Sequence, residues 1–241
     1  PYGDWLRFPF DNAENLYIIP EVDCCRVITD HSVELLQRVP PVTAALMRIG
    51  SIEPSAMLLD ASDAFEMGSP ASDEAARAIK KTGLLMEAVE TCTEAATKEF
   101  DVGMQKRLLK AASYGMHFSY KDPTEGIIMG GSLENQHPID DKTMPSETAI
   151  KFTTAARTLR ILNALRDPSV GFILTAAQFD QITPTGVVAR LVAMKRPALA
   201  SSISGYLGLP KSVQLFARAS KAAAFVASDK SKSDAETAEA A

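Results

Sequence analysis

Four prolines constrain this chain more than any other feature of its sequence. Pro54, Pro184, Pro197 and Pro210 each stand where a run with helical periodicity begins. Proline suits the first turn of a helix, because its fixed φ fits and its missing N–H would have no partner there. Residues 40–227 are therefore expected to form successive short helices joined by short turns, without a strict repeat period. This pattern predicts a mainly α fold, an irregular α-solenoid of stacked helix pairs.

The clearest helix is expected at residues 83–98. Its acidic residues and Lys98 fall on one side. The opposite side is an apolar stripe made of Leu84, Leu85, Ala88, Val89, Cys92, Ala95 and Ala96. A stripe of this kind faces a core. Cys92 is therefore predicted to be a buried small hydrophobe rather than a reactive thiol.

Several short sequence patterns predict where helices begin and where neighbouring helices pack closely. Asp101 is expected to cap the next helix, and Thr175 with Gln178 forms a capping-box pattern. Gly115 would let a neighbouring helix approach closely. Residues 184–210 predict a helical hairpin, with one inner face made by Val187, Val188, Leu191 and Val192 and the other by Leu199, Ile203, Tyr206 and Leu207.

The first 39 residues differ from the rest. They contain short apolar runs of the β type, and Asp30 to Ser32 indicates a tight turn between two of them. So few strands make too little sheet to be stable alone. The chain starts at Pro1 without an initiator Met, and we interpret it as a fragment of a longer protein.

Two further segments break the helical pattern. Residues 120–146 are rich in Pro, Gly, Asp and Asn and predict a long inserted loop. Residues 228–241 have no large apolar side chain and predict a disordered tail.

Charge is distributed unevenly along the chain. Residues 1–70 carry 4 basic and 11 acidic side chains, whereas residues 151–227 carry 10 basic and 2 acidic ones. Such asymmetry can mark a surface for an acidic partner or a membrane. The simpler interpretation, which we favour, is a solvated helix face balanced by the acidic half. The candidate surface residues are Arg157, Arg160, Arg166, Arg190, Lys195 and Arg196.

The residues that carry chemistry are sparse and scattered. The three histidines have no second ligand at helical spacing, and the three cysteines lack C-x-x-C spacing. His137 beside Asp140 and Asp141 is the one ligand cluster, and it lies in the predicted loop. No phosphate loop or nucleophile elbow occurs, and basic residues are not interleaved with aromatics as nucleic-acid binding would need. We therefore expect no enzyme activity, cofactor or metal.

An ordered set of segments carries a family resemblance across residues 4 to 215. The segments are DWLRFPF (4–10), IPEVDCCRVIT (19–29), LLQRVP (35–40), MQKRLLKAASYG (104–115), LRILNALRD (159–167) and RLVAMKRPALASSISGYLGLP (190–210). Together they resemble the vacuolar protein sorting-associated protein sixteen family, core subunits of the HOPS and CORVET membrane-tethering complexes. The sequence departs from the family pattern in the loop at 121–145, which is longer, and after Pro210, where the match weakens.

The resemblance implies a domain order and a role. Residues 1–39 would be the C-terminal end of an incomplete β-propeller, and residues 40–227 the first part of the solenoid. The implied role is that of a non-enzymatic scaffold in docking and SNARE-mediated fusion, cytoplasmic and peripheral on late endosome and vacuole or lysosome membranes. Its implied partners are other tether subunits, including the SM-type SNARE chaperone, whose contact is expected C-terminal to this fragment. The alternative is a peripheral membrane-binding helical module that uses the basic region 151–227.

Overall fold

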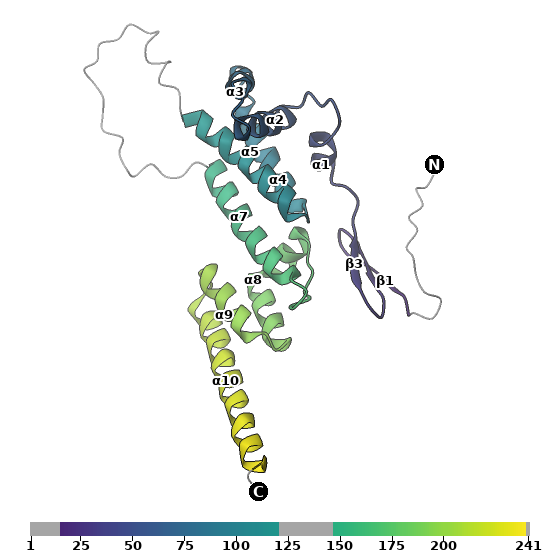
Figure 1. The fold of residues 1–241 in the computed structure, drawn as a ribbon, viewed down its shortest axis with the longest axis vertical. Coiled ribbons are helices and arrows are strands. Elements are labelled where there is room, and N and C mark those ends of the chain that lie inside the picture. The colour runs from purple at the N-terminus through teal and green to yellow at the C-terminus, as the bar shows by residue number, and fades with distance from the viewer. Residues whose placement is uncertain (1–14, 121–146, 240–241) are drawn as a thin grey trace, which may run out of the picture. The chain divides into compact units, whose positions relative to one another are not determined.

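The computed structural model of the chain describes residues 15–120 and 147–239 (Figure 1). Its contacts divide the chain into two compact units, Pro1–Val39 and Pro40–Ala241. The inserted loop at 120–146, His137, the segment DWLRFPF and the end of the tail lie wholly or almost wholly outside the described residues. Helices dominate the described part, and a small sheet precedes them, so the predicted mainly α class with N-terminal strands is confirmed.

The sheet of the first unit is an antiparallel meander. It consists of β1 (Tyr17–Pro20), β2 (Cys25–Ile28) and β3 (Val33–Leu36), in the order β1-β2-β3. The register pairs Ile18 with Val27 and Val27 with Glu34. The predicted turn is closed by a hydrogen bond of 2.9 Å from the Thr29 amide to the Ser32 carbonyl. Val27 is the buried apolar residue of these strands, at 5% exposure, so this unit has very little core of its own.

Five helices form the first part of the second unit. They are α1 (Pro41–Leu46), α2 (Pro54–Glu66), α3 (Ala71–Lys81), α4 (Leu85–Lys98) and α5 (Val102–Tyr120). Leu58, Val89 and Leu108 come from three of these helices and are all fully buried in one core, which also contains Cys92. The predicted stripe of α4 is confirmed from Leu85 to Ala96. Leu84 is the N-cap residue and is 38% exposed, so its placement on the buried stripe was wrong.

Four helices form the second part. They are α7 (Glu147–Arg166), α8 (Ala176–Ala193), α9 (Pro197–Tyr206) and α10 (Lys211–Glu239). A second core takes Leu162 and Leu165 from α7, Val188 and Leu191 from α8 and Ile203 from α9. Figure 1 shows α2–α5 at one end of the helical unit and α9 and α10 at the other. Leu159 of α7 belongs to the first core, so this one helix contributes to both.

Local signals set most of the helix ends. Pro54 and Pro197 occupy first-turn positions, as predicted. The amide of Met104 donates to Asp101 Oδ2 at 2.6 Å, which makes Asp101 the cap of α5. The Thr175–Gln178 capping box is complete, with both reciprocal bonds at 3.1 Å. These bonds satisfy amides that a helix N-terminus leaves without partners inside the helix.

Pro184 marks a change of direction inside α8. Thr183 has φ 66° and ψ 152°, outside the helical region, and the chain resumes its helix at Pro184. The predicted helix start at this pair is confirmed as a kink within α8. Proline disfavours the helical conformation in the residue before it, which explains why the break falls at Thr183.

The close approach predicted at Gly115 is also present. A Cβ placed on this residue would lie 2.6 Å from Val89 Cγ2 and 3.0 Å from Leu58 Cδ2. Any side chain here would push against α4 and α2, so glycine is what allows the three helices to pack at this distance.

Two regions differ from their predictions. Tyr206 is 41% exposed and bonds to an arginine instead of facing the core, so its predicted inward orientation was wrong. The backbone of α10 continues to Glu239 through the stretch predicted to be disordered. Alanine, lysine and glutamate occur there, and their high helix propensity favours a helical backbone.

Candidate functional site

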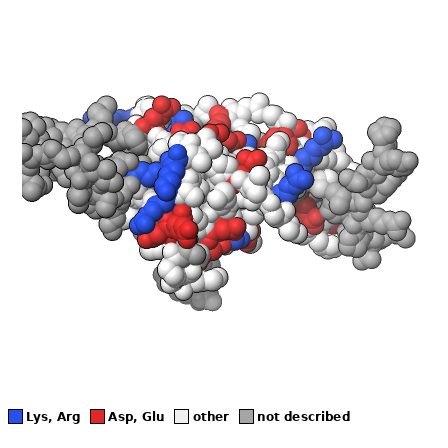
Figure 2. All heavy atoms as spheres, turned by 90° about the horizontal axis from the view of Figure 1, so that it is seen from above, with Lys and Arg blue, Asp and Glu red and all other residues white. Residues whose placement is uncertain are grey.

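Several charged side chains of α2–α5 form ion pairs with one another. Arg107 of α5 bonds to both carboxylate oxygens of Asp63 on α2, with Nε at 3.1 and 2.9 Å. This bond raises the pKa of Arg107. One turn further along, Lys110 pairs with Glu66 at 2.5 Å. Figure 2 shows the same intermingling, with blue and red side chains next to each other on the displayed face.

A further charged group joins α4 to α7. Glu90 accepts a hydrogen bond of 3.0 Å from the Thr148 hydroxyl and one of 3.2 Å from Lys151 Nζ. Lys151 also pairs with Glu147 at 3.1 Å. The bonds from Thr148 and then Lys151 lower the pKa of Glu90. Both side chains of the Glu90–Lys151 pair are more than a third exposed, so the pair positions α7 more than it stabilises the fold.

The basic residues after Lys151 are arranged differently. Within the described part of the chain, none of the nine others in this region forms an ion pair with a carboxylate. Eight of them are exposed: Arg157, Arg160, Arg190, Lys195, Arg196, Lys211, Arg218 and Lys221. Between residues 181 and 227 the sequence contains no Asp or Glu at all. The second half of the helical unit therefore presents positive charge that its own surface does not neutralise.

Arg166 is the exception among the predicted surface residues. Its Nε and Nη2 donate to the Leu174 carbonyl at 3.1 and 2.9 Å, and Nη1 donates to the Glu99 carbonyl at 3.5 Å. The guanidinium carbon also lies 4.1 Å from the centre of the Phe100 ring. Burial lowers the pKa of Arg166 to about 10. Arg166 thus joins three chain segments inside the fold and does not project as an open cation.

The other five predicted residues lie on two helices, α7 and α8, and on the turn that follows α8. Arg160 of α7 donates to the Tyr206 hydroxyl at 3.3 Å, with its guanidinium 5.7 Å from the centre of that ring. Arg196, in the turn between α8 and α9, donates to the Ser169 carbonyl. Lys195 precedes it with φ 58°, a left-handed conformation that ends α8 sharply. Arg157 and Arg190 are exposed on α7 and α8.

The turn between α8 and α9 borders an open groove of about 460 Å³. Lys195, Arg196 and Pro197 line one side of it, and Asp167 and Ser169 line the other. Asp167 accepts a 2.8 Å bond from the Ser169 amide. Bonds from Ser169 lower the pKa of Asp167, which is therefore an anion within the groove. The groove carries both signs of charge, so it has no clear preference for an anionic ligand.

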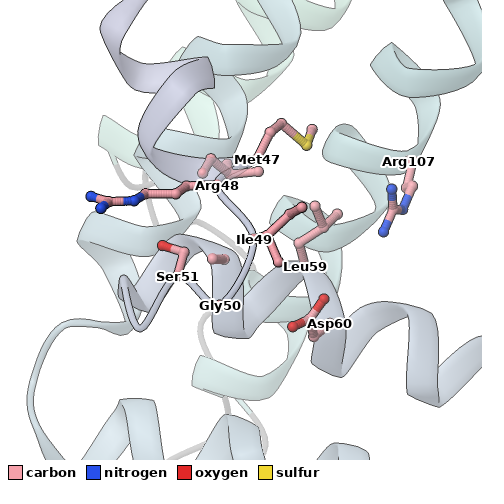
Figure 3. Close-up of a pocket in the computed structure, with 10 residues that line it drawn as sticks. Met47, Arg48, Ile49, Gly50, Ser51, Leu59, Asp60 and Arg107 are labelled. Atoms are coloured by element: carbon pink, nitrogen blue, oxygen red, sulfur yellow. The ribbon is translucent and has the colours of Figure 1, made fainter.

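A second cavity, of about 290 Å³, lies under the turn between α1 and α2 (Figure 3). Met47, Ile49 and Leu59 form its apolar wall, and Asp60 and Arg107 lie at its edge. In Figure 3, Arg48 projects to the side opposite Arg107. Ile49 is fully exposed, so the turn displays an apolar side chain to solvent. No signal in the sequence pointed to this cavity, because it is formed by residues about 60 positions apart.

Metal-ligand side chains do not gather in the part of the chain that the structure describes. Within residues 15–120 and 147–239, no cluster of three or more His, Cys, Asp or Glu side chains could hold a metal ion. Cys92 is fully buried, and this burial raises the pKa of its thiol to about 12, so its predicted role as a small hydrophobe is confirmed. His137, Asp140 and Asp141 lie outside the described residues. Among the helices that can be described, none combines the length and hydropathy needed to cross a membrane.

Comparison with known proteins gives one consistent family. Residues 1–128 match the family model "Vps16, N-terminal region". The chain is 38% identical over 213 residues to "Protein VACUOLELESS1" of Arabidopsis thaliana, an alignment that covers 88% of this chain and 21% of that protein. It is 34% identical over 214 residues to a "Vacuolar protein sorting-associated protein 16 homolog" of Dictyostelium discoideum, covering 88% and 22%. It is 35% identical over 192 residues to "Vacuolar protein sorting-associated protein 16" of Saccharomyces cerevisiae, covering 80% and 20%. The chain spans about a fifth of the length of these relatives.

Proposed function

The chain belongs to the Vps16 family, and from this premise we propose that it is part of a non-catalytic scaffold subunit in vacuolar protein sorting. In this role it would join tethering complexes of the HOPS and CORVET type, which hold membranes together before SNARE-mediated fusion. It would act on the cytoplasmic side of late endosome and vacuole or lysosome membranes.

The observation that carries this proposal is the family match together with the way the helices pack. Most helices of the second unit bury small and aliphatic side chains against neighbouring helices, and α7 contributes to both cores. Helices stacked in this way produce an extended surface on which partners can bind side by side. The domain arrangement proposed with it has a propeller end at residues 1–39 and the first part of a solenoid at 40–227. The contact with the SM-type SNARE chaperone is proposed to lie beyond this segment.

Affinity purification of the whole tagged chain from cells tests the assembly role. We expect tether subunits, identified by mass spectrometry, to be enriched over an unrelated helical bait of equal size. A folded chain, shown by circular dichroism, that recovers none of them would contradict an assembly contact in this segment.

A chimera tests the role in sorting without depending on one contact. Residues aligned with the Saccharomyces cerevisiae relative, 192 in number, would replace the matching segment of that protein. We expect cells with the chimera to retain a vacuolar hydrolase, whereas cells lacking the relative should secrete it. A chimera present at normal abundance that still secretes the hydrolase would count against the proposed function.

A further inference from the structure

The outer side of α10 is the most unusual surface among the described residues. Val213 and Ala217 pack into the second core, and Ala217 is completely buried. Lys211, Arg218 and Lys221 are exposed, and residues 211–227 include no acidic side chain. Over residues 211–227 the helix therefore has one side that packs against its neighbours and another that carries three exposed cations without an acid in the same stretch.

Apolar and basic residues share that outer side. Lys211, Leu215, Arg218, Ala222 and Val226 follow one another at intervals of four, three, four and four residues, which places them on a single helical face. Leu215 is 63% exposed and Val226 is 65% exposed. Phe216, which is 50% exposed, lies on the flank between this face and the packed side of the helix. We call Lys211, Leu215, Arg218, Ala222 and Val226 the outer face of α10.

The mixture of residues argues against packing on another apolar helix. Such a contact would bury Lys211 and Arg218, and the described part of the chain offers neither of them a carboxylate. Burying a charge without a partner is costly. An anionic membrane surface satisfies both kinds of residue, because cations meet lipid headgroups while aliphatic and aromatic side chains enter the acyl boundary.

We propose that the outer face of α10 binds the surface of membranes that contain anionic lipids. Arg190, Lys195 and Arg196 on the adjoining α8 and its turn add to the attraction before contact, since residues 181–227 lack any acid to oppose it. The inference rests on the proposed function for its setting, the surface of endosomes and vacuoles. It adds to that function the residues that contact the membrane and the class of lipid that they bind.

Vesicle flotation with the whole purified chain tests the inference. Neutral phosphatidylcholine vesicles would be compared with vesicles that also contain phosphatidylserine, at low and at high salt. We expect the chain to float with the anionic vesicles alone and to be released as salt rises. No flotation with anionic vesicles at low salt would overturn the proposal.

Paired variants locate the contact. The change Lys211→Glu with Arg218→Glu should weaken binding by about tenfold or more, because each basic residue near an anionic surface contributes appreciably. Arg77→Glu with Lys106→Glu is the matched control, with two exposed cations reversed on α3 and α5 and the same change in net charge. Leu215→Ser with Val226→Ser keeps every charge and should also weaken binding. Equal losses in the control and the α10 variant would overturn the proposal, because the effect would then depend on net charge alone.

The remaining outcomes distinguish membrane binding from binding to a protein. They also test this inference separately from the proposed function. If light scattering detects self-association that the α10 variants abolish, the outer face binds a second copy and the proposal fails. Co-purification of tether subunits is measured on the same variants. Subunits retained without vesicle binding would reject this inference alone, whereas vesicle binding without subunits would count against the proposed function alone.

Discussion

The side-chain amides of Gln105 and Asn163 bond to each other in both directions. Gln105 Nε2 donates to Asn163 Oδ1 at 3.2 Å, and Asn163 Nδ2 donates to Gln105 Oε1 at 2.7 Å. Gln105 Nε2 also donates to the Glu99 carbonyl at 2.8 Å, and the residue is only 2% exposed. A polar pair with its bonds satisfied fixes the position of α7 against α5 in a way that apolar contacts alone would not.

Removing both members of this pair should cost less than the sum of the costs of removing each alone. Asn163→Ala leaves the buried amide of Gln105 without its partner, and we expect the free energy of unfolding to fall by about 1–3 kcal/mol. Asn163→Leu combined with Gln105→Leu should lose less than the sum of the single changes, measured by urea unfolding. Gln181→Ala on the exposed side of α8 is the control and should change stability by about 0.5 kcal/mol or less. Additive losses would mean that the two amides act independently.

Gly115 should tolerate no side chain. Gly115→Ala places a methyl group within 2.6 Å of Val89 Cγ2, and the overpacking should destabilise the fold by about 1–3 kcal/mol. Gly205→Ala is the matched helical change, because nothing lies within 4 Å of its added Cβ. That variant should be stabilised by about 0.5–1 kcal/mol. Thermal unfolding of both variants is the measurement, and equal shifts would refute the close approach at Gly115.

Arg166 should behave as a structural residue. Arg166→Met keeps an apolar stem but loses the bonds to the Leu174 and Glu99 carbonyls, and we expect a loss of about 2–3 kcal/mol in unfolding free energy. Arg166→Lys should recover only part of it, since an ammonium cannot bond and stack in the same way. Arg157→Met, at an exposed position of α7, is the control. If an Arg166 variant had normal stability but bound partners or vesicles more weakly, the prediction that Arg166 belongs to a binding surface would be supported instead.

Cys92 should be unreactive in the folded chain and should couple stability to alkaline pH. Its pKa is raised to about 12 by burial, whereas a thiol in the unfolded chain ionises near pH ~8.5. Above that pH the unfolded state has lost the proton and the folded state retains it. Stability is therefore full below about pH 8.5 and falls by about 1.4 kcal/mol per pH unit toward pH 12.

The comparison for Cys92 is with Cys92→Ala, which removes this contribution while other titrating groups remain. The difference in unfolding free energy between the two proteins should change with pH as stated. In thiol labelling under native conditions, the half-buried Cys24 and Cys25 should react much faster than Cys92. Rapid labelling of Cys92 without unfolding would contradict its burial.

Signals confined to a few residues were predicted well. Asp101, the Thr175–Gln178 box and Pro197 act within one turn of their own helix, so the sequence contains everything that decides their conformation. The stripe of α4 was predicted for a similar reason, because periodicity alone reports which side faces a core. Leu84 was assigned to that stripe although it is the N-cap residue. The backbone angles of an N-cap are not helical, so helical periodicity does not predict the direction of its side chain.

Contacts between distant segments were not predictable in the same way. Arg166 was grouped with surface cations, but its environment is made by Phe100 and by the Leu174 and Glu99 carbonyls. Periodicity does not show whether a polar residue at the border of a stripe will bond inside the fold. Tyr206 illustrates the reverse error, since its hydroxyl bonds to Arg160 at the surface and its ring stays partly in solvent. The assignment of surface residues for a partner or membrane thus remains a prediction.

The helix α7 has a mechanical consequence through its place in both cores. Leu159 is buried in the first core. Leu162 and Leu165, less than two turns further along the same helix, are buried in the second core. A bend between the two halves must either shear one set of side chains out of its packing or rupture backbone hydrogen bonds of α7. Both deformations lose packing or hydrogen-bond energy, so α7 should resist bending between the two cores. We expect bending of the helical unit to occur more readily at its ends than at α7.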